Sequence, residues 1–155
     1  MNENAIGTLV VDCAVELHRD LGPGLLETVY EVTLARALER RGLRVQRQVC
    51  VPIEYKGETF DEGFRADLIV GNLVIVELKS VERVAPAHKK QVLTYLRLTG
   101  LKLGYLLNFG AVLMRDGITR IIHGNLDPEP PCLRASVREI SIEPPDPPNA
   151  AGSRH

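Results

Sequence analysis

Three ionisable residues stand beside two neighbouring apolar runs, where a folded protein rarely places charge. Asp67 precedes a run that ends at Val70. A second run begins at Leu73 and ends with Glu77 and Lys79, which lie two residues apart and therefore on one face of a strand. The second run is apolar on both faces, as in a central strand buried on both sides. Two carboxylates and an ammonium at the end of such a strand are unfavourable unless they pair or bind a metal.

Two interpretations of this cluster follow from the residue types. Carboxylate oxygens bind Mg²⁺ through one or two groups while the ion keeps several waters, and a bound water is a better nucleophile. A nearby lysine could then orient the water or offset charge that develops on a phosphate. The alternative is a buried ion pair, of Glu77 or Asp67 with Lys79, that has no catalytic task. The local sequence leaves both interpretations open.

The turn between the two runs offers a test of the metal interpretation. Gly71-Asn72 is typical of a β-hairpin, and a strict two-residue loop would pair Asp67 with Val76. That register would leave Asp67 on the face opposite Glu77, because a shift of one residue inverts every side chain. A shared metal site therefore predicts a loop of odd length, such as Val70-Gly71-Asn72, or a bulge close to Asp67.

Composition excludes some classes of protein. The 155 residues carry a formal net charge of -1, so a binder with a generally basic surface is excluded and any basic surface must be local. Aromatic residues make up 5% and Trp is absent, which argues against a base-stacking platform for single strands.

The cysteines favour a cytoplasmic protein. The three residues, Cys13, Cys50 and Cys132, are far apart and form no CxxC pair, which argues against a zinc site. Their odd number suits a reducing compartment. No apolar run approaches the ~20 residues that span a bilayer, and the N-terminus lacks a secretory pattern, so we expect no contact with membranes.

Hydrophobic periodicity predicts an α/β protein with a mixed central sheet flanked by helices. The expected elements are helices over Ala5–Arg19, Leu25–Arg41 and Ala87–Leu98, strands over Leu43–Tyr55 and Leu101–Phe109, the hairpin around Gly71-Asn72, and a second hairpin over Val112–Ile122 around Asp116-Gly117. Pro52 predicts that its strand ends at a sheet edge.

The expected domain covers residues 5–123, and residues 124–155 form a Pro-rich tail that is largely disordered, although Leu133–Ile142 could add a short element. Basic residues gather in two runs, over Arg36–Arg47 and over Lys79–Lys102. Phosphate contacts need local cations of this kind. The commoner meaning of such runs is a solvated helix face.

The motif blocks resemble those of a known family. Asp67, nine residues and then Glu77-Leu78-Lys79, after a helix that carries Glu27, resemble the PD-(D/E)XK nuclease superfamily. Gly24-Leu25-Leu26-Glu27-Thr28-Val29-Tyr30 resembles the motif that names the GxxExxY protein family of that superfamily, as do the runs His18–Gly24 and Leu98–Lys102. The resemblance covers roughly residues 6–122. Ala66 replaces the proline that often precedes the aspartate.

The resemblance implies a restriction-endonuclease-like core and a role for each matching position. Asp67 and Glu77 would bind a Mg²⁺ or Mn²⁺ ion, with the Leu78 carbonyl as a further ligand and Glu27 as a helix-borne acid beside the metal. Lys79 would be the catalytic lysine. Gln91 and Tyr95 match a Gln-xxx-Tyr pair that positions substrate or site. Tyr30 we assign to packing, because it lies on the apolar stripe of its helix.

The resemblance thus implies a metal-dependent nuclease that hydrolyses phosphodiester bonds, with DNA favoured over RNA by family analogy only. The alternative is a non-catalytic binding or assembly module that keeps the nuclease fold, since function is carried by the site and not by the fold. A homodimer would suit so small a nuclease, because two sites cut two strands more easily than one.

Overall fold

The computed structural model describes residues 1–126 and 138–142. In chain order its elements are α1 (Glu3–Leu21), α2 (Glu27–Arg40), β1 (Val45–Tyr55), β2 (Glu58–Val70), β3 (Val74–Lys79), α3 (Pro86–Thr99), β4 (Leu103–Asn108), α4 (Met114–Gly117), β5 (Ile118–His123) and β6 (Arg138–Ile142). The helices and strands predicted up to Phe109 are present, and the ends given for them differ by at most two residues.

The six strands form one mixed sheet in the order β1-β2-β3-β4-β5-β6. Neighbours are antiparallel except for β3 with β4 and β5 with β6, which are parallel. Residues 74–78 of β3 are all buried, which confirms the prediction of a central strand covered on both faces. The parallel β3–β4 pair is joined by α3, as in a βαβ unit.

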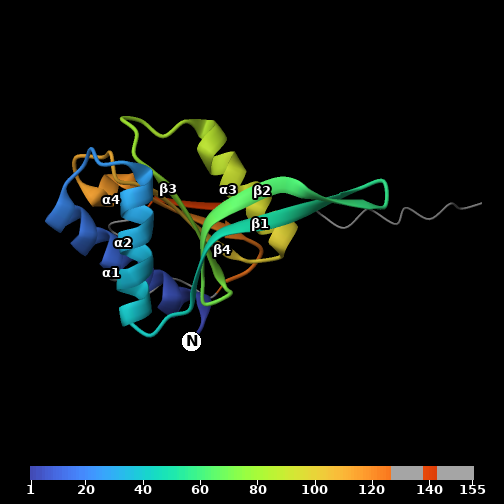
Figure 1. Cartoon of the computed structure of the whole chain (residues 1–155), viewed down its shortest axis with the longest axis horizontal. Helices are drawn as coiled ribbons and strands as arrows, with labels where there is room; N and C mark the ends of the chain where they lie inside the picture. Colours follow the sequence, from blue (N-terminus) through green and yellow to red (C-terminus); the bar gives the residue numbers. More distant parts are fainter. Residues whose placement is uncertain (127–137, 143–155) are drawn as a thin grey trace, which may run out of the picture.

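Helices cover both faces of the sheet (Figure 1). α1 and α2 pack on one face through an apolar core that includes Leu68 and Val76, whereas α3 packs on the other face through a core that includes Ile69 and Ile75. Alternate residues of β2 and β3 therefore point into different cores, as a regular strand requires. α1 presents its predicted apolar stripe to the sheet, with Cys13 3% exposed.

The β1–β2 hairpin projects from the body as a two-stranded arm (Figure 1). Its turn at Lys56-Gly57 has left-handed φ values of 50° and 77°. β1 is an edge strand whose register shifts between Val51 and Ile53, around Pro52, and this confirms the edge predicted from that proline. The acidic residues Glu54, Glu58, Asp61 and Glu62 all lie on this arm and are exposed.

Two predictions about the C-terminal third are corrected by the structure. Val112–Ile122 is not a hairpin, because residues 114–117 form the short helix α4 and β5 pairs with β4 and β6. The sheet also continues past residue 123, into the predicted tail, where β6 confirms that Leu133–Ile142 could add a short element. Residues 127–137 and 143–155 of that tail, Cys132 included, lie outside the described residues.

Among the described residues, none of the helices has the length and apolar character needed to cross a membrane.

Candidate active site

The loop between β2 and β3 has three residues, which confirms the predicted odd length. Val70 pairs with Val74, so Gly71, Asn72 and Leu73 form the loop, one position further along than the example expected. Gly71 and Asn72 take left-handed φ values of 59° and 56°. Leu68 consequently pairs with Val76, and the same register continued by one step sets Asp67 opposite Glu77.

In both β1 and β2 the alternation of side chains between the two faces of the sheet is interrupted, at Gln48 in β1 and at Asp67 in β2. On β1, Val45 packs into the core under α1 and α2, whereas Val49 packs into the core under α3. On β2, Leu68 belongs to the first core and Ala66 to the second. Residues an even number of positions apart share a face on a regular strand, so both strands must depart from regular geometry between these positions.

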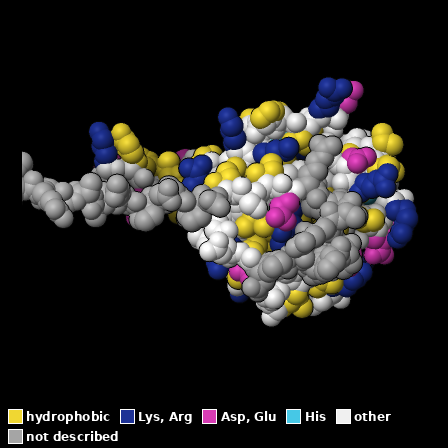
Figure 2. Space-filling model, turned by 180° about the vertical axis from the view of Figure 1, so that it is seen from behind, with side chains coloured by type: hydrophobic (Ala, Val, Ile, Leu, Met, Phe, Trp, Pro, Cys, Tyr) yellow, Lys and Arg dark blue, Asp and Glu magenta, His cyan; other side chains and the backbone are white. Residues whose placement is uncertain are grey.

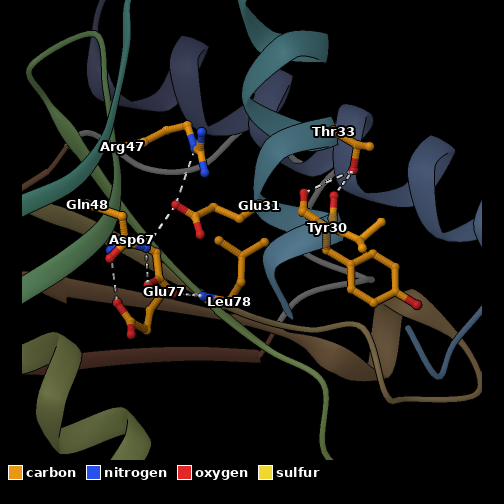
Figure 3. A network of polar contacts seen from close by, with 9 residues as sticks. Tyr30, Glu31, Thr33, Arg47, Gln48, Asp67, Glu77 and Leu78 are labelled. Atoms are coloured by element: carbon orange, nitrogen blue, oxygen red, sulfur yellow. Dashed lines mark hydrogen bonds and ion pairs between the residues drawn. The ribbon is translucent and has the colours of Figure 1, made fainter. Parts of the chain in front are cut away.

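Gln48 provides the irregularity on β1, with a left-handed φ of 52°. A non-glycine residue in this conformation is uncommon, and such residues often occur at functional sites. The conformation lets two consecutive side chains reach the same carboxylate, which a regular strand forbids. Arg47 Nε lies 3.4 Å from Glu31 Oε1, and Gln48 Nε2 donates to the same oxygen at 2.9 Å (Figure 3).

The Asp67 carboxylate lies between β2 and β3 and replaces part of their ladder. Its Oδ2 accepts a hydrogen bond from the Leu78 N–H at 2.9 Å, and its Oδ1 accepts one from Gln48 Nε2 at 3.3 Å. Burial raises the pKa of Asp67, the Leu78 hydrogen bond lowers it, and the charge of Glu31 raises it again.

Glu77 approaches Asp67 from β3. Its Oε2 lies 3.5 Å from the Asp67 N–H, and the residue is 4% exposed. Burial and then the charge of Asp67 raise the pKa of Glu77 to about 8, against the opposing effect of the Lys79 ammonium. Lys79 also lowers the pKa of Asp67, so its charge acts on both carboxyl groups. Asp67 and Glu77 therefore meet, and Lys79 follows two residues after Glu77 on the same face of β3.

Glu31, on α2, is a site residue that the sequence analysis missed. It is 6% exposed and is linked to Asp67 through the shared donor Gln48 (Figure 3). A sequence signal existed, because Glu31 shares the helical stripe of the buried residues Ala35 and Leu38, where charge is unexpected. The contacts from Arg47 and Gln48 had no such signal, since they depend on the left-handed φ.

Glu27, the predicted helix-borne acid, begins α2 one turn before Glu31 and is exposed. The contacts described above connect Glu31, and not Glu27, with Asp67. Tyr30 is fully buried, stacks on Phe109 at 4.3 Å between ring centroids and donates to the Gly22 carbonyl, in agreement with a packing role. In Figure 3 its ring points away from the carboxylates.

The predicted pair Gln91 and Tyr95 lies on α3 beside the same end of β2. Gln91 Nε2 donates to the Tyr95 hydroxyl at 2.8 Å, and that hydroxyl donates to the Arg65 carbonyl at 3.0 Å. Burial and then the charge of Glu77 raise the pKa of Tyr95 to about 12. The phenol therefore stays protonated and holds α3 against the strand that carries Asp67.

The donor set fits a hard divalent cation. Two carboxyl groups with raised pKa values lie side by side, and a cation between them would relieve their repulsion. Within the described ranges, no three side chains of His, Cys, Asp or Glu form a ready-made metal cage. Mg²⁺ commonly uses one or two carboxylates and completes its shell with water, so Asp67 and Glu77 would suffice.

No curated protein and no solved structure matches the chain significantly. Residues 4–121 match a protein family described as the PD-(D/E)XK nuclease superfamily. The match spans every helix and strand from α1 to α4 together with the clustered Asp67, Glu77 and Lys79, and the chain belongs to the PD-(D/E)XK nuclease superfamily.

Proposed function

We propose that the protein is a Mg²⁺- or Mn²⁺-dependent nuclease that hydrolyses phosphodiester bonds, with DNA favoured over RNA. The observation that carries the proposal is the meeting of Asp67 and Glu77 between β2 and β3, with the charge of Lys79 acting on both carboxyl groups. A buried ion pair alone would need one carboxylate for one ammonium. The second carboxylate is better explained by a divalent cation.

Each residue has a distinct part in this proposal. Asp67 and Glu77 hold the ion, and the Leu78 carbonyl is a further candidate ligand. A bound divalent ion would lower the pKa of a coordinated water and offset charge on the phosphate. Lys79 would offset charge on the reacting phosphate, and Gln91 with Tyr95 fixes the position of α3 at the site.

Local basic residues support a nucleic-acid substrate despite the net charge of -1. In Figure 2, Lys and Arg side chains are spread around the margin of one face, with Asp and Glu between them. Arg36, Arg40 and Arg41 line one groove beside α2, while Arg47 reaches the site itself. Contacts of this kind position a phosphate backbone without reading its sequence.

The decisive experiment measures cleavage of duplex, single-stranded and branched DNA, and of RNA, with Mg²⁺, Mn²⁺ or EDTA. We expect divalent-dependent cleavage that is abolished in Asp67→Asn and falls at least about 100-fold in Lys79→Ala. Matched controls are Asp61→Asn and Lys56→Ala, both on the exposed arm, and both are expected to retain wild-type rates. Absence of cleavage of every substrate with Mn²⁺ would overturn the proposal.

The second candidate is a non-catalytic binding or assembly module. The exposed acidic arm favours it, because negative charge repels a phosphate backbone. Calorimetric titration of Mg²⁺ and Mn²⁺ separates the two candidates. A nuclease binds the ion in wild type and not in Asp67→Asn, whereas a module without a metal site shows no heat that depends on Asp67.

We further propose membership of the GxxExxY family, supported by Gly24, Glu27 and Tyr30 at the motif spacing. A cytoplasmic location is supported by the odd number of cysteines. A homodimer is proposed on the ground that duplex cleavage needs two cuts, and light scattering coupled to size exclusion tests it.

A further inference from the structure

The backbone that follows Lys79 is held by one buried side chain from the neighbouring strand. Asn108 ends β4 and is 3% exposed. Its Oδ1 accepts from the Val81 N–H at 3.0 Å, and its Nδ2 donates to the Val81 carbonyl at 2.9 Å. The amide therefore satisfies both backbone groups of one residue, as an adjacent strand would.

The surrounding contacts tighten the same connection. Lys79 pairs with Asn108 at the last step of the parallel β3–β4 ladder, and the next N–H, that of Phe109, donates to the Lys79 carbonyl at 2.8 Å. The Gly110 N–H donates to Asn108 Oδ1 at 3.0 Å. A Cβ on Gly110 would lie 2.2 Å from the Val81 carbonyl oxygen, so only glycine permits this approach.

Residue 80 is fixed from the opposite side. The Ser80 hydroxyl donates to the Leu25 carbonyl at 2.7 Å, just before α2 begins. The backbone on the C-terminal side of Lys79 is thus tied both to β4 and to the start of the helix that carries Glu31. The Asn108 amide makes three hydrogen bonds to this connection, so any shift of the backbone after Lys79 would leave buried polar groups unpaired.

We propose that Asn108 is a positioning residue that holds the Lys79 ammonium in place beside Asp67 and Glu77. The inference rests on the proposed nuclease function. Asn108 touches neither substrate nor metal, and it acts by fixing the backbone from which the lysine side chain extends. Loss of the amide frees residues 80 and 81, and the ammonium then samples positions away from the reacting phosphate, where it is less effective.

The first test compares Asn108→Ala with Thr99→Ala, a control that also removes side-chain hydrogen bonds to backbone, at the far end of α3. We expect Asn108→Ala to lower kcat at least 10-fold with KM changed less than about threefold. Mn²⁺ affinity by calorimetry should stay within about twofold of wild type, because Asp67 and Glu77 make no contact with Asn108 or Val81 among the hydrogen bonds described above. Thr99→Ala should keep wild-type kcat.

A double-mutant cycle separates positioning of Lys79 from general destabilisation. In a Lys79→Ala background, Asn108→Ala should cause no further loss of rate, since the group it positions is gone. An equal loss of rate with and without Lys79 would overturn the inference, as would a fall in Mn²⁺ affinity equal to the fall in rate.

A readout without catalysis keeps the inference testable if the proposed function fails. Lysines methylated with ¹³C report their surroundings by NMR, and the Lys79 resonance is assigned by its loss in Lys79→Ala. We expect this resonance to shift on addition of Mg²⁺ to wild type and to lose most of that shift in Asn108→Ala, approaching the response of exposed Lys102. An unchanged Lys79 response in Asn108→Ala would overturn the positioning role whether or not nucleic acid is cut.

Discussion

Glu27 and Glu31 lie four residues apart on α2, yet their surroundings differ sharply. Glu27 is exposed in the first turn, where the helix dipole alone favours an acid. Glu31 is buried, forms an ion pair with Arg47 and accepts a hydrogen bond from Gln48. Its charge raises the pKa of Asp67. If Asp67 binds the proposed metal ion, Glu31 would orient it through their shared donor Gln48, as groups hydrogen-bonded to metal ligands typically do.

We therefore expect Glu31→Gln to weaken Mn²⁺ binding or cleavage by about 10- to 100-fold, and Glu27→Gln to have less than a threefold effect. Calorimetry and single-turnover cleavage measure both variants, which remove the same charge from the same helix face. The reverse order would restore Glu27 to the role that the family motif implies.

The Glu77 carboxyl group makes the stability of the metal-free protein depend on pH. Its pKa in the folded protein is about 8, above the ordinary 4.5, so between these values the native state holds a proton that the unfolded chain has released. Stability contributed by this group is complete below pH 4.5 and is lost as pH rises towards 8. The raised pKa of Asp67 acts with the same sign.

In EDTA, the free energy of unfolding measured with urea is expected to fall as pH rises from 5 to 8. Glu77→Gln cannot ionise, so it should flatten this slope and be more stable than wild type at pH 8. Saturating Mg²⁺ should also stabilise wild type at pH 8 and leave Glu77→Gln nearly unaffected. A wild-type stability that rises over this range in EDTA would contradict the pKa shift.

At the scale of elements, the helices and strands that depend on local sequence pattern could be predicted. Apolar periodicity located α1, α2, α3 and the strands up to β4, and the metal hypothesis required the odd loop after Val70 that the structure has. The hairpin predicted around Asp116-Gly117 was wrong, because this dipeptide has the composition of a hairpin turn but forms the end of α4. Tertiary contacts decide the fold of this segment: the His18 ring donates to the Ala111 carbonyl at 2.8 Å, and Met114 is buried under α1.

The sequence pointed to the charged residues of the candidate site but not to the side chains that hold them in place. Asp67, Glu77 and Lys79 were identified from residue type and spacing, and Gln91 and Tyr95 from the family resemblance. Gln48 was not, because no local pattern announces a left-handed glutamine within a strand. Asn108 was not, because its partner Val81 is 27 residues away in the chain. Supports of this kind depend on long-range geometry that a single sequence does not display.

The left-handed Gln48 yields a prediction about β1. A β-branched residue is strained at a φ of 52°, so Gln48→Val should lower the free energy of unfolding by about 1–3 kcal/mol. Gln48→Gly relieves the backbone while removing the amide, and it should stay within about 1 kcal/mol of wild type. Gln46→Val, on the same strand, is the control expected to be near neutral. Equal effects of the two valine variants would show that Gln48 is not strained.

At the scale of the whole molecule, β6 is joined to α1 through a buried arginine. Arg120 on β5 is 1% exposed and contacts Glu139 of β6, with Nη1 2.6 Å from Oε2, and Asn4 near the start of α1. The sheet and the first helix therefore share one guanidinium. This link is why β6 belongs to the folded domain although it lies past the boundary that composition indicated.

A chain that ends at Ile142 should match the full-length protein in its urea midpoint. A chain that ends at residue 137 lacks β6 and the Arg120–Glu139 pair, and we expect it to be less stable by several kcal/mol, on the order of 3–5. Glu139→Gln should lie between them. Coincident unfolding curves for the two truncated chains would show that β6 contributes nothing to the domain.

The three-residue loop at Gly71–Leu73 carries a consequence for natural variation in chain length. One residue added or removed there would place the two carboxylates on opposite faces of the sheet, or it would turn the apolar side chains of β3 towards the opposite core. Adding two residues keeps the alternation intact. Active homologues should therefore tolerate length changes at this turn only in even steps, and odd changes should mark lineages in which catalysis has been abandoned.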